Sequence, residues 1–101
     1  MTGNGADIID DNMVGPVIRA GALADAVTSA AEDDNPGKDV HVFERGDYVR
    51  IHIDRNLRLT RASIENHLGK PFNLALLEAE MPSFKGRMES SVDEVRWFYL
   101  R

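Results

Sequence analysis

A proline in the middle of an apolar run sets the strongest limit on how this chain can fold. The segment NMVGPVIRAG, residues 12–21, has the branched side chains of a buried strand on both sides of Gly15-Pro16. Proline lacks the N–H that a strand donates to its neighbour. Such a strand is expected at a sheet edge, with the proline as its own first residue, or where something other than the sheet covers it. We therefore expect the first strand to have an unpaired edge.

The 101-residue chain is long enough for one modest core. It has no cysteine, which excludes disulfides, thiolate nucleophiles and cysteine-ligated metal centres. Its net charge is −5, and residues 1–40 hold eight acids against two bases. This excess of acids argues against nucleic acid as a partner and favours a basic protein surface. No window is apolar enough for a membrane span and no signal core opens the chain, so we expect a cytoplasmic protein that does not bind a membrane.

Helical patterns occur at three places. Alanine-rich residues 22–33 carry apolar side chains at helical spacing and stop at the turn Asn35-Pro36-Gly37-Lys38. Thr60 as a cap and the following apolar spacing predict a second helix over 61–68. Asn73 can cap a third, shorter helix with Leu74, Leu77 and Met81 pointing inward.

Alternating apolar residues predict strands at 40–44, 48–53, around Leu57 and Leu59, at 84–88 and at 95–100. Together with the helices, they predict a compact single α+β domain over residues 13–101. Its expected order is βαββ followed by ααββ, with mainly antiparallel sheets packed with two to three helices. Residues 1–12 are rich in glycine and aspartate, so we expect a mobile N-terminal tail there.

The strands at 40–44 and 48–53 are predicted to form a hairpin. A loop at Arg45-Gly46 gathers four branched side chains on one face by pairing Val42 with Val49 and Val40 with Ile51. The same register puts His41 opposite Arg50 and only diagonally from His52. A divalent metal at these two histidines would then face a guanidinium charge, so we expect ordinary, partly exposed histidines instead.

No motif in the chain predicts catalysis. The acid pairs fall in the tail, at a helix end and in a turn, where nothing would desolvate them, and the serines lack a nucleophile-elbow context. No glycine-rich loop has the frame of a nucleotide site. Trp97 to Tyr99 are read as a strand with at least one face in the core rather than as a ligand platform. We therefore expect no catalytic residue, no metal and no cofactor.

Five stretches in order resemble one family: NMVGPVIRAG, DNPGK, YVRI, LRLTRASIENHLGKPFN and LEAEMPSFKG. They are similar to the cofactor-free effector, or coupling, proteins of the soluble diiron multicomponent monooxygenases, in the toluene and alkene four-component branch. The resemblance runs from about Asn12 to the C-terminus. The methane branch differs, because its regulator has a long N-terminal tail where about a dozen residues precede the first strand here.

The resemblance implies a non-catalytic protein, a monomer when free, that binds a diiron hydroxylase and couples O2 activation and NADH use to oxidation of an aromatic or alkene substrate. The residues expected at the partner interface come from three stretches: Val14, Gly15, Pro16, Arg19, Asn35, Pro36, Lys38, Lys70, Phe72 and Asn73. Two alternatives remain open for function, a small-molecule-sensing domain and an adaptor unrelated to oxygenation.

Two local alternatives also remain open. The unpaired edge at Gly15-Pro16 is expected to be covered by the hydroxylase, or else to be a plain edge of the free domain. Asn35 is expected to contact the partner, or else only to cap the helix before it. If Asn35 contacts the partner, replacing it with alanine is expected to weaken coupling and to leave the fold intact.

Overall fold

The computed structural model describes residues 12–99. Apart from Asn12, the tail predicted at 1–12 lies outside this range, as does the predicted strand end at Leu100. The elements are, in chain order, β1 (Met13–Arg19), α1 (Ala22–Asp34), β2 (His41–Arg45), β3 (Tyr48–Asp54), β4 (Asn56–Thr60), α2 (Arg61–Leu68), the 3₁₀ helix η2 (Leu74–Glu80), β5 (Ser83–Lys85), β6 (Arg87–Ser90) and β7 (Glu94–Phe98). The α+β fold is confirmed.

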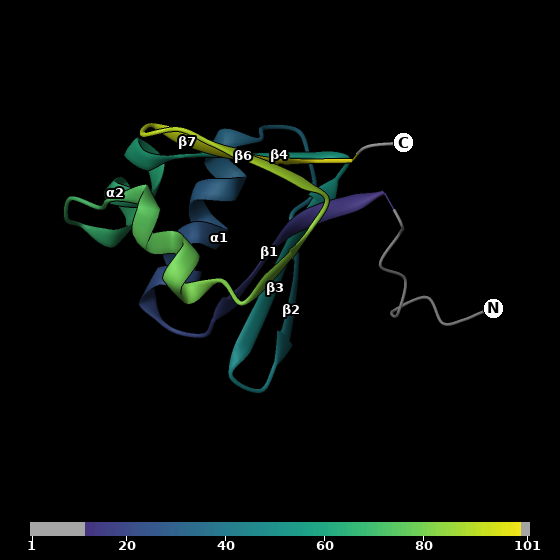
Figure 1. The fold of residues 1–101 in the computed structure, drawn as a ribbon, viewed down its shortest axis with the longest axis horizontal. Helices are drawn as coiled ribbons and strands as arrows, with labels where there is room; N and C mark the ends of the chain where they lie inside the picture. Colours follow the sequence, from purple (N-terminus) through teal and green to yellow (C-terminus); the bar gives the residue numbers. More distant parts are fainter. Residues whose placement is uncertain (1–11, 100–101) are drawn as a thin grey trace.

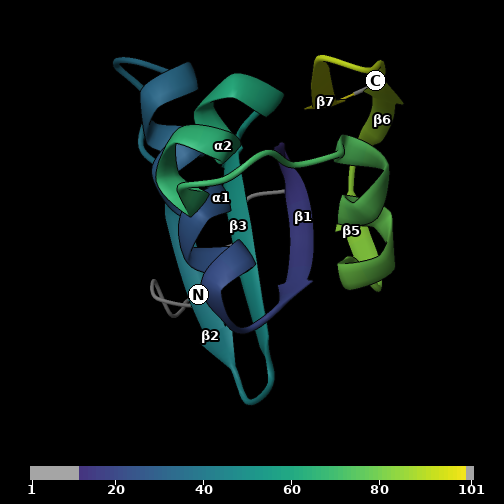
Figure 2. The same ribbon diagram turned by 90° about the vertical axis from the view of Figure 1, so that its left-hand side faces the viewer.

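Two antiparallel sheets make up the fold. The first has the order β2-β3-β1-β5 and the second the order β4-β7-β6. The second sheet runs along the top of Figure 1, with the strands of the first sheet below it on the right and the helices on the left. Figure 2 shows α1 and α2 in front of β3 and to the left of β1, with β5, β6 and β7 to the right of β1. The core contains buried side chains from both sheets, both helices and η2.

The first strand is an interior strand, so the prediction of an unpaired edge is wrong. Its pairing with β3 stops at Val14 and resumes at Val17. Across this gap β1 has a neighbour on its other side, because Gly15 lies opposite Lys85 of β5 and Pro16 opposite Phe84. The proline is tolerated because the ladder with β3 is interrupted where its N–H is missing. Inside the domain, β5 covers the strand at the place where we expected either the hydroxylase or a plain edge.

A single predicted strand at 84–88 is two strands in two different sheets. Gly86 separates β5 from β6, and its φ of 99° lies in the region that favours glycine. A Cβ at this position would lie 2.7 Å from Cγ1 of Val14 and 2.9 Å from the carbonyl oxygen of Phe98. The chain therefore changes sheets at one residue that has no room for a side chain.

The hairpin of β2 and β3 forms, but its register is two residues from the predicted one. Arg45 pairs with Tyr48, so the loop is Gly46-Asp47 rather than Arg45-Gly46. Because the shift is an even number of residues, the faces stay as predicted. The partners change: Val42 pairs with Ile51 and Glu44 with Val49. The pairing of His41 with Arg50 is wrong too, because His41 lies opposite His52.

The helices and the core follow the predictions closely. Thr60 accepts a hydrogen bond from the Ser63 N–H at 3.2 Å and so caps α2, which ends at Gly69 with φ 78°. The inward face predicted for the helix after Asn73 is confirmed, since Leu74, Leu77 and Met81 are all buried. Trp97 is the largest fully buried side chain, which confirms the core reading of the aromatic strand.

Candidate partner interface

Asn35 ends α1 and ties it to the second sheet. Its side-chain amide donates to the carbonyl oxygens of Ala31 and Arg58, both at 2.8 Å, and its amide oxygen accepts from the Arg58 N–H at 3.1 Å. The residue is 9% exposed. The Asn35 side chain thus bonds both backbone groups of Arg58, as a neighbouring strand would do at this position of β4. A side chain with these three bonds is part of the fold, so we expect its removal to lower the stability of the domain.

The substitution Asn35→Ala is expected to lower the free energy of unfolding by about 2 kcal/mol, because it leaves the N–H and the carbonyl oxygen of Arg58 without their side-chain partner. Denaturant unfolding measures this. The control is Asn66→Ala on the exposed side of α2, expected to change stability by less than about 0.5 kcal/mol. Equal stability of the two variants would contradict the structural role of Asn35.

The turn after Asn35 holds two further residues of the predicted interface. Pro36 is exposed, and Gly37 adopts the positive φ of 82° that a turn of this kind requires. The Lys38 ammonium donates to the carbonyl oxygens of Asp54 at 3.3 Å and Asn56 at 3.1 Å. These bonds hold the lysine against the junction of β3 and β4 while it stays exposed.

Lys70, Phe72 and Asn73 lie together on the segment between α2 and η2. Lys70 and Asn73 are exposed, and Phe72 is half-buried against the core. The Phe72 N–H donates to the Glu65 carboxylate at 2.8 Å, and Asn73 caps η2 by accepting from the Ala75 N–H at 3.0 Å. The segment is therefore fixed in place by side chains on both of its ends.

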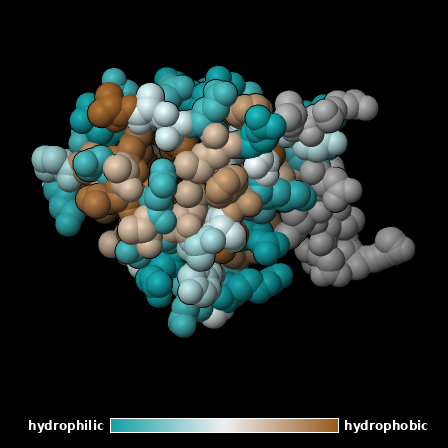
Figure 3. Space-filling view, in the orientation of Figure 1, coloured by the Kyte–Doolittle hydropathy of each residue, from teal (hydrophilic) through white to brown (hydrophobic). Residues whose placement is uncertain are grey.

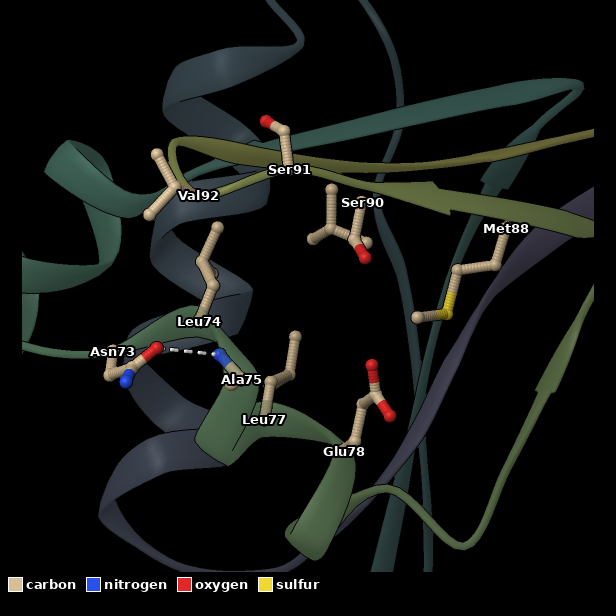
Figure 4. Close-up of a pocket in the computed structure, with 10 residues that line it drawn as sticks. Asn73, Leu74, Ala75, Leu77, Glu78, Met88, Ser90, Ser91 and Val92 are labelled. Atoms are coloured by element: carbon tan, nitrogen blue, oxygen red, sulfur yellow. Dashed lines mark hydrogen bonds between the residues drawn. The ribbon is translucent and has the colours of Figure 1, made fainter.

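A groove begins at Asn73 and separates η2 from the β6–β7 turn. Figure 4 shows Leu74, Leu77 and Glu78 rising from η2 toward Met88 and the residues of the turn. Its volume is about 290 Å³. A second hollow of about 380 Å³ shares Asn73 and Val92 with it and continues along the segment after α2. In Figure 3 apolar side chains gather over η2 and near the turn; Val92 is 71% exposed and Leu76 56%.

The residues predicted on β1 divide into buried and exposed ones. Val14, Gly15 and Pro16 are buried, so none of them presents a side chain to a partner. Arg19 is exposed at the end of the strand, with its guanidinium 3.5 Å from the Glu80 carboxylate and 5.7 Å from the centre of the Tyr48 ring. The ten predicted residues therefore lie in three separate places, and six of them have accessible or half-buried side chains.

The face of the first sheet that points away from the core carries aromatic and basic side chains, and we call it the outer face. Its rows include Arg45 beside Tyr48 and Phe43 beside Arg50. The rings of His41 and Phe43 stack with centroids 6.4 Å apart. Between β1, β3 and β5 this face has a hollow of about 300 Å³, lined by Val17, Arg50, His52, Ser83, Phe84 and Lys85.

His52 was expected to be partly exposed, but it is 2% exposed and packs against the backbone of Gly15. Burial is the main cause that lowers its pKa to about 4, and the charges of Arg50 and Lys85 lower it further, with a small contribution from His41. An interaction of the His52 ring with the backbone of Gly15 raises the pKa and so opposes part of this lowering. Even so, neither ring nitrogen has a hydrogen-bond partner of ordinary geometry within residues 12–99. The imidazole is therefore neutral at pH 7.

No cluster of three or more histidine, cysteine, aspartate or glutamate side chains able to hold a metal ion is present in the part of the chain that the structure describes. Nor does any helix among these residues have the length and apolar character needed to cross a membrane.

The groove and the hollow contain residues that sequence reasoning did not predict. Val92 had a usable signal, because it is an isolated apolar residue in the acidic stretch SSVDE. Met88 and Glu78 face each other only through the fold. The burial of His52 could not be predicted, since a histidine on the polar face of an alternating strand is expected to be solvent-exposed.

Known proteins similar to this chain agree with the resemblance in its motifs. The family model described as the MmoB/DmpM family matches residues 12–98. The effector subunit of the alkene monooxygenase system of Xanthobacter autotrophicus is 70% identical over 93 residues, which cover 92% of each chain. Two solved structures of a phenol hydroxylase–regulatory protein complex contain chains of the same fold. One has a TM-score of 0.74 at 19% identity and covers 87% of this chain and 99% of its own. The other has a TM-score of 0.68 at 20% identity and covers 84% and 99%.

The family model spans almost all of the residues that the structure describes, and the curated relative is far above the identity at which a family is shared. The chain belongs to the MmoB/DmpM family.

Proposed function

We propose that this protein is the effector of a multicomponent alkene monooxygenase. It binds the diiron hydroxylase of that system and couples O2 activation and NADH use to oxidation of the hydrocarbon. The observation that carries the proposal is the 70% identity, over 92% of each chain, to a protein named as the effector subunit of an alkene monooxygenase system. At that identity the surface as well as the core is largely shared.

A protein of this kind acts through binding energy. It changes the partner's active site only to the extent that it binds one state of the partner more tightly than another. Moving a partner from a 1:99 to a 99:1 mixture of two states requires about 5.5 kcal/mol of differential affinity. An interface of about 1,600 Å² of total buried area is large enough to supply that difference.

We infer that the partner-facing residues are the accessible members of the predicted set: Arg19, Pro36, Lys38, Lys70, Phe72 and Asn73. Val14, Gly15, Pro16 and Asn35 act indirectly, by fixing the backbone from which these side chains project. The groove between η2 and the β6–β7 turn adjoins Asn73 and supplies exposed apolar area of the kind that interface centres use. The protein is a cytoplasmic monomer when free.

The test is steady-state alkene oxidation by a purified diiron hydroxylase with its electron-transfer components, titrated with the full chain. The expected result is a rise in the ratio of epoxide formed to NADH consumed that saturates with the effector concentration. Lysozyme at the same concentrations controls for non-specific protein effects. A ratio that stays constant while the chain binds the hydroxylase would favour the adaptor alternative, and no binding at all would contradict the proposal.

A further inference from the structure

The groove between η2 and the β6–β7 turn has an apolar floor and an exposed apolar rim. Leu74, Leu77 and Val95 are buried beneath it, and Met88 is half-buried on its β6 side. At the rim, Val92 is the most exposed large apolar side chain of residues 12–99, although turns usually carry polar residues. Exposed apolar surface beside a groove is typical of a place where another molecule binds.

The groove also has one charge on its wall. Glu78 is the only charged residue that lines it within the described part of the chain. Its side chain rises from η2 toward β6 (Figure 4), and its carboxylate has no hydrogen-bond or ion-pair partner among residues 12–99. A carboxylate next to apolar surface attracts a cation that is itself attached to an apolar group.

The other acids of η2 and of the β6–β7 turn already have partners. Asp93 and Glu94 at the turn each lie 2.9 Å from an arginine of this chain, and Glu80 at the end of η2 lies 3.5 Å from another. Glu78 therefore differs from its neighbours, because its charge is left for a group outside the described residues. The net charge of −5 favours a basic group on a partner.

We propose that the groove receives a segment of the hydroxylase that presents an apolar side chain with a lysine or arginine beside it, which rests on the proposed function. The apolar side chain enters between Leu77 and Met88, and the cation pairs with Glu78. The thioether of Met88 adapts to the shape of what enters. The volume of about 290 Å³ is at the lower end of the roughly 300–1,000 Å³ of small-ligand pockets, so the groove suits a side chain better than a free ligand.

The groove is continuous with the partner surface inferred above. Asn73 and Val92 line both the groove and the second hollow, which extends to Phe72. A protein segment that passes over Val92 covers both hollows at once, whereas a small molecule fills only one. Val92 is thus placed at the centre of the contact, where apolar side chains contribute most to affinity.

The apolar part of the contact is tested with Val92→Ser in the full chain, and Val42→Ser is the matched control. Both valines are exposed, but Val42 lies on β2 in the other sheet. We expect V92S to bind the purified hydroxylase about fivefold or more weakly, and V42S to bind within about twofold of wild type. The loss in V92S should persist at about 1 M NaCl, because salt does not screen an apolar contact.

The charged part is tested with Glu78→Gln, and Glu32→Gln on the exposed side of α1 is the matched control. At low ionic strength E78Q should bind the hydroxylase about fivefold more weakly, and E32Q within about twofold of wild type. At about 1 M NaCl the affinities of E78Q and wild type should converge, because screening removes most of the charge attraction.

Thermal melts show whether each variant is folded, which we expect because all four side chains are exposed. Weaker binding by both V92S and E78Q, with both controls unchanged, supports the proposal. If either V92S or E78Q binds as tightly as wild type, the proposal is wrong and the effector function still stands. Failure of the wild-type chain to bind the hydroxylase contradicts the function itself and the proposal with it.

Sedimentation of the chain without hydroxylase tests for a second copy in the groove. The proposal predicts that wild type and V92S both sediment as monomers. A wild type that dimerises while V92S does not would show that the groove binds another copy of this chain, and the proposal would fall.

Discussion

Replacing Gly15 with alanine is expected to lower the free energy of unfolding by roughly 3–5 kcal/mol, a large part of the stability of a domain of this size. Two causes add. The φ of Gly15 is 142°, a conformation that residues with a side chain rarely adopt. A Cβ there would also lie 2.1 Å from the carbonyl oxygen of Ile51 and 3.1 Å from Cδ2 of His52. The first of these is a backbone atom, which cannot rotate away.

Chemical denaturation of wild type and G15A measures this loss, and circular dichroism shows whether the variant folds at all. Gly46→Ala is the matched control, because Gly46 also has a positive φ, of 61°, but no atom within 4 Å of the added methyl group. We expect it to cost about 1 kcal/mol. If G15A is no less stable than G46A, β1 is not held against β3 as described.

The second large effect is a loss of stability in mild acid caused by His52. Burial, followed by the charges of Arg50 and Lys85, lowers the pKa of the folded-state ring from its ordinary 6.5 to about 4. Between these values the unfolded chain binds a proton that the folded chain does not, so stability falls as the pH falls from about 6.5 toward 4. The pKa difference corresponds to about 3 kcal/mol of folding stability, which is fully present above pH 7 and is lost as the pH falls toward 4.

Because other groups also titrate in this pH range, the contribution of His52 is measured as the difference in stability between wild type and a variant without the imidazole. The free energy of unfolding is determined from pH 4 to pH 7.5 for wild type and for His52→Phe, which replaces the imidazole with a somewhat larger aromatic ring that does not titrate. The difference between the two proteins should change by about 3 kcal/mol across the range. If H52F does not fold, the ring resonances of His52 in wild type should show no titration above about pH 5. A flat difference, or a ring that titrates near pH 6.5, would contradict the buried neutral imidazole.

Local signals in the sequence were enough to predict the helices. Thr60 and Gly69 bound α2 because capping and left-handed termination depend on residues within one turn. The end of α1 at Asn35 and the turn at Gly37 follow the same logic. The buried face of β7 was also predictable, since a tryptophan in an alternating strand usually packs in the core.

The sheets were harder to predict, because strand neighbours are chosen by distant residues. The proline in β1 indicates correctly that the ladder is broken there, but only the fold shows that the three residues of β5 fill the other side. The register of the β2–β3 hairpin depended on which two residues form the loop, and both choices leave the same faces inward. Local patterns could not distinguish them.

The predicted interface divides along the same line. Exposed residues next to turns, such as Lys38 and Lys70, could be named from the sequence, since turns lie at the surface. Asn35 could not be assigned in this way, because the carbonyl and amide of Arg58 that occupy its side chain lie 23 residues away. The hollow over His52 combines residues of three strands and has no local pattern at all.

The change of sheet at Gly86 bears on how this protein can influence another. Val14 and the carbonyl oxygen of Phe98 lie so close to that one residue that no side chain fits between the two sheets there. A rigid body gives up little conformational entropy when it docks, so more of its contact energy is left to act on the other molecule. On the proposed function, we expect this small protein to dock without rearranging its sheets and the hydroxylase to be the one that changes shape.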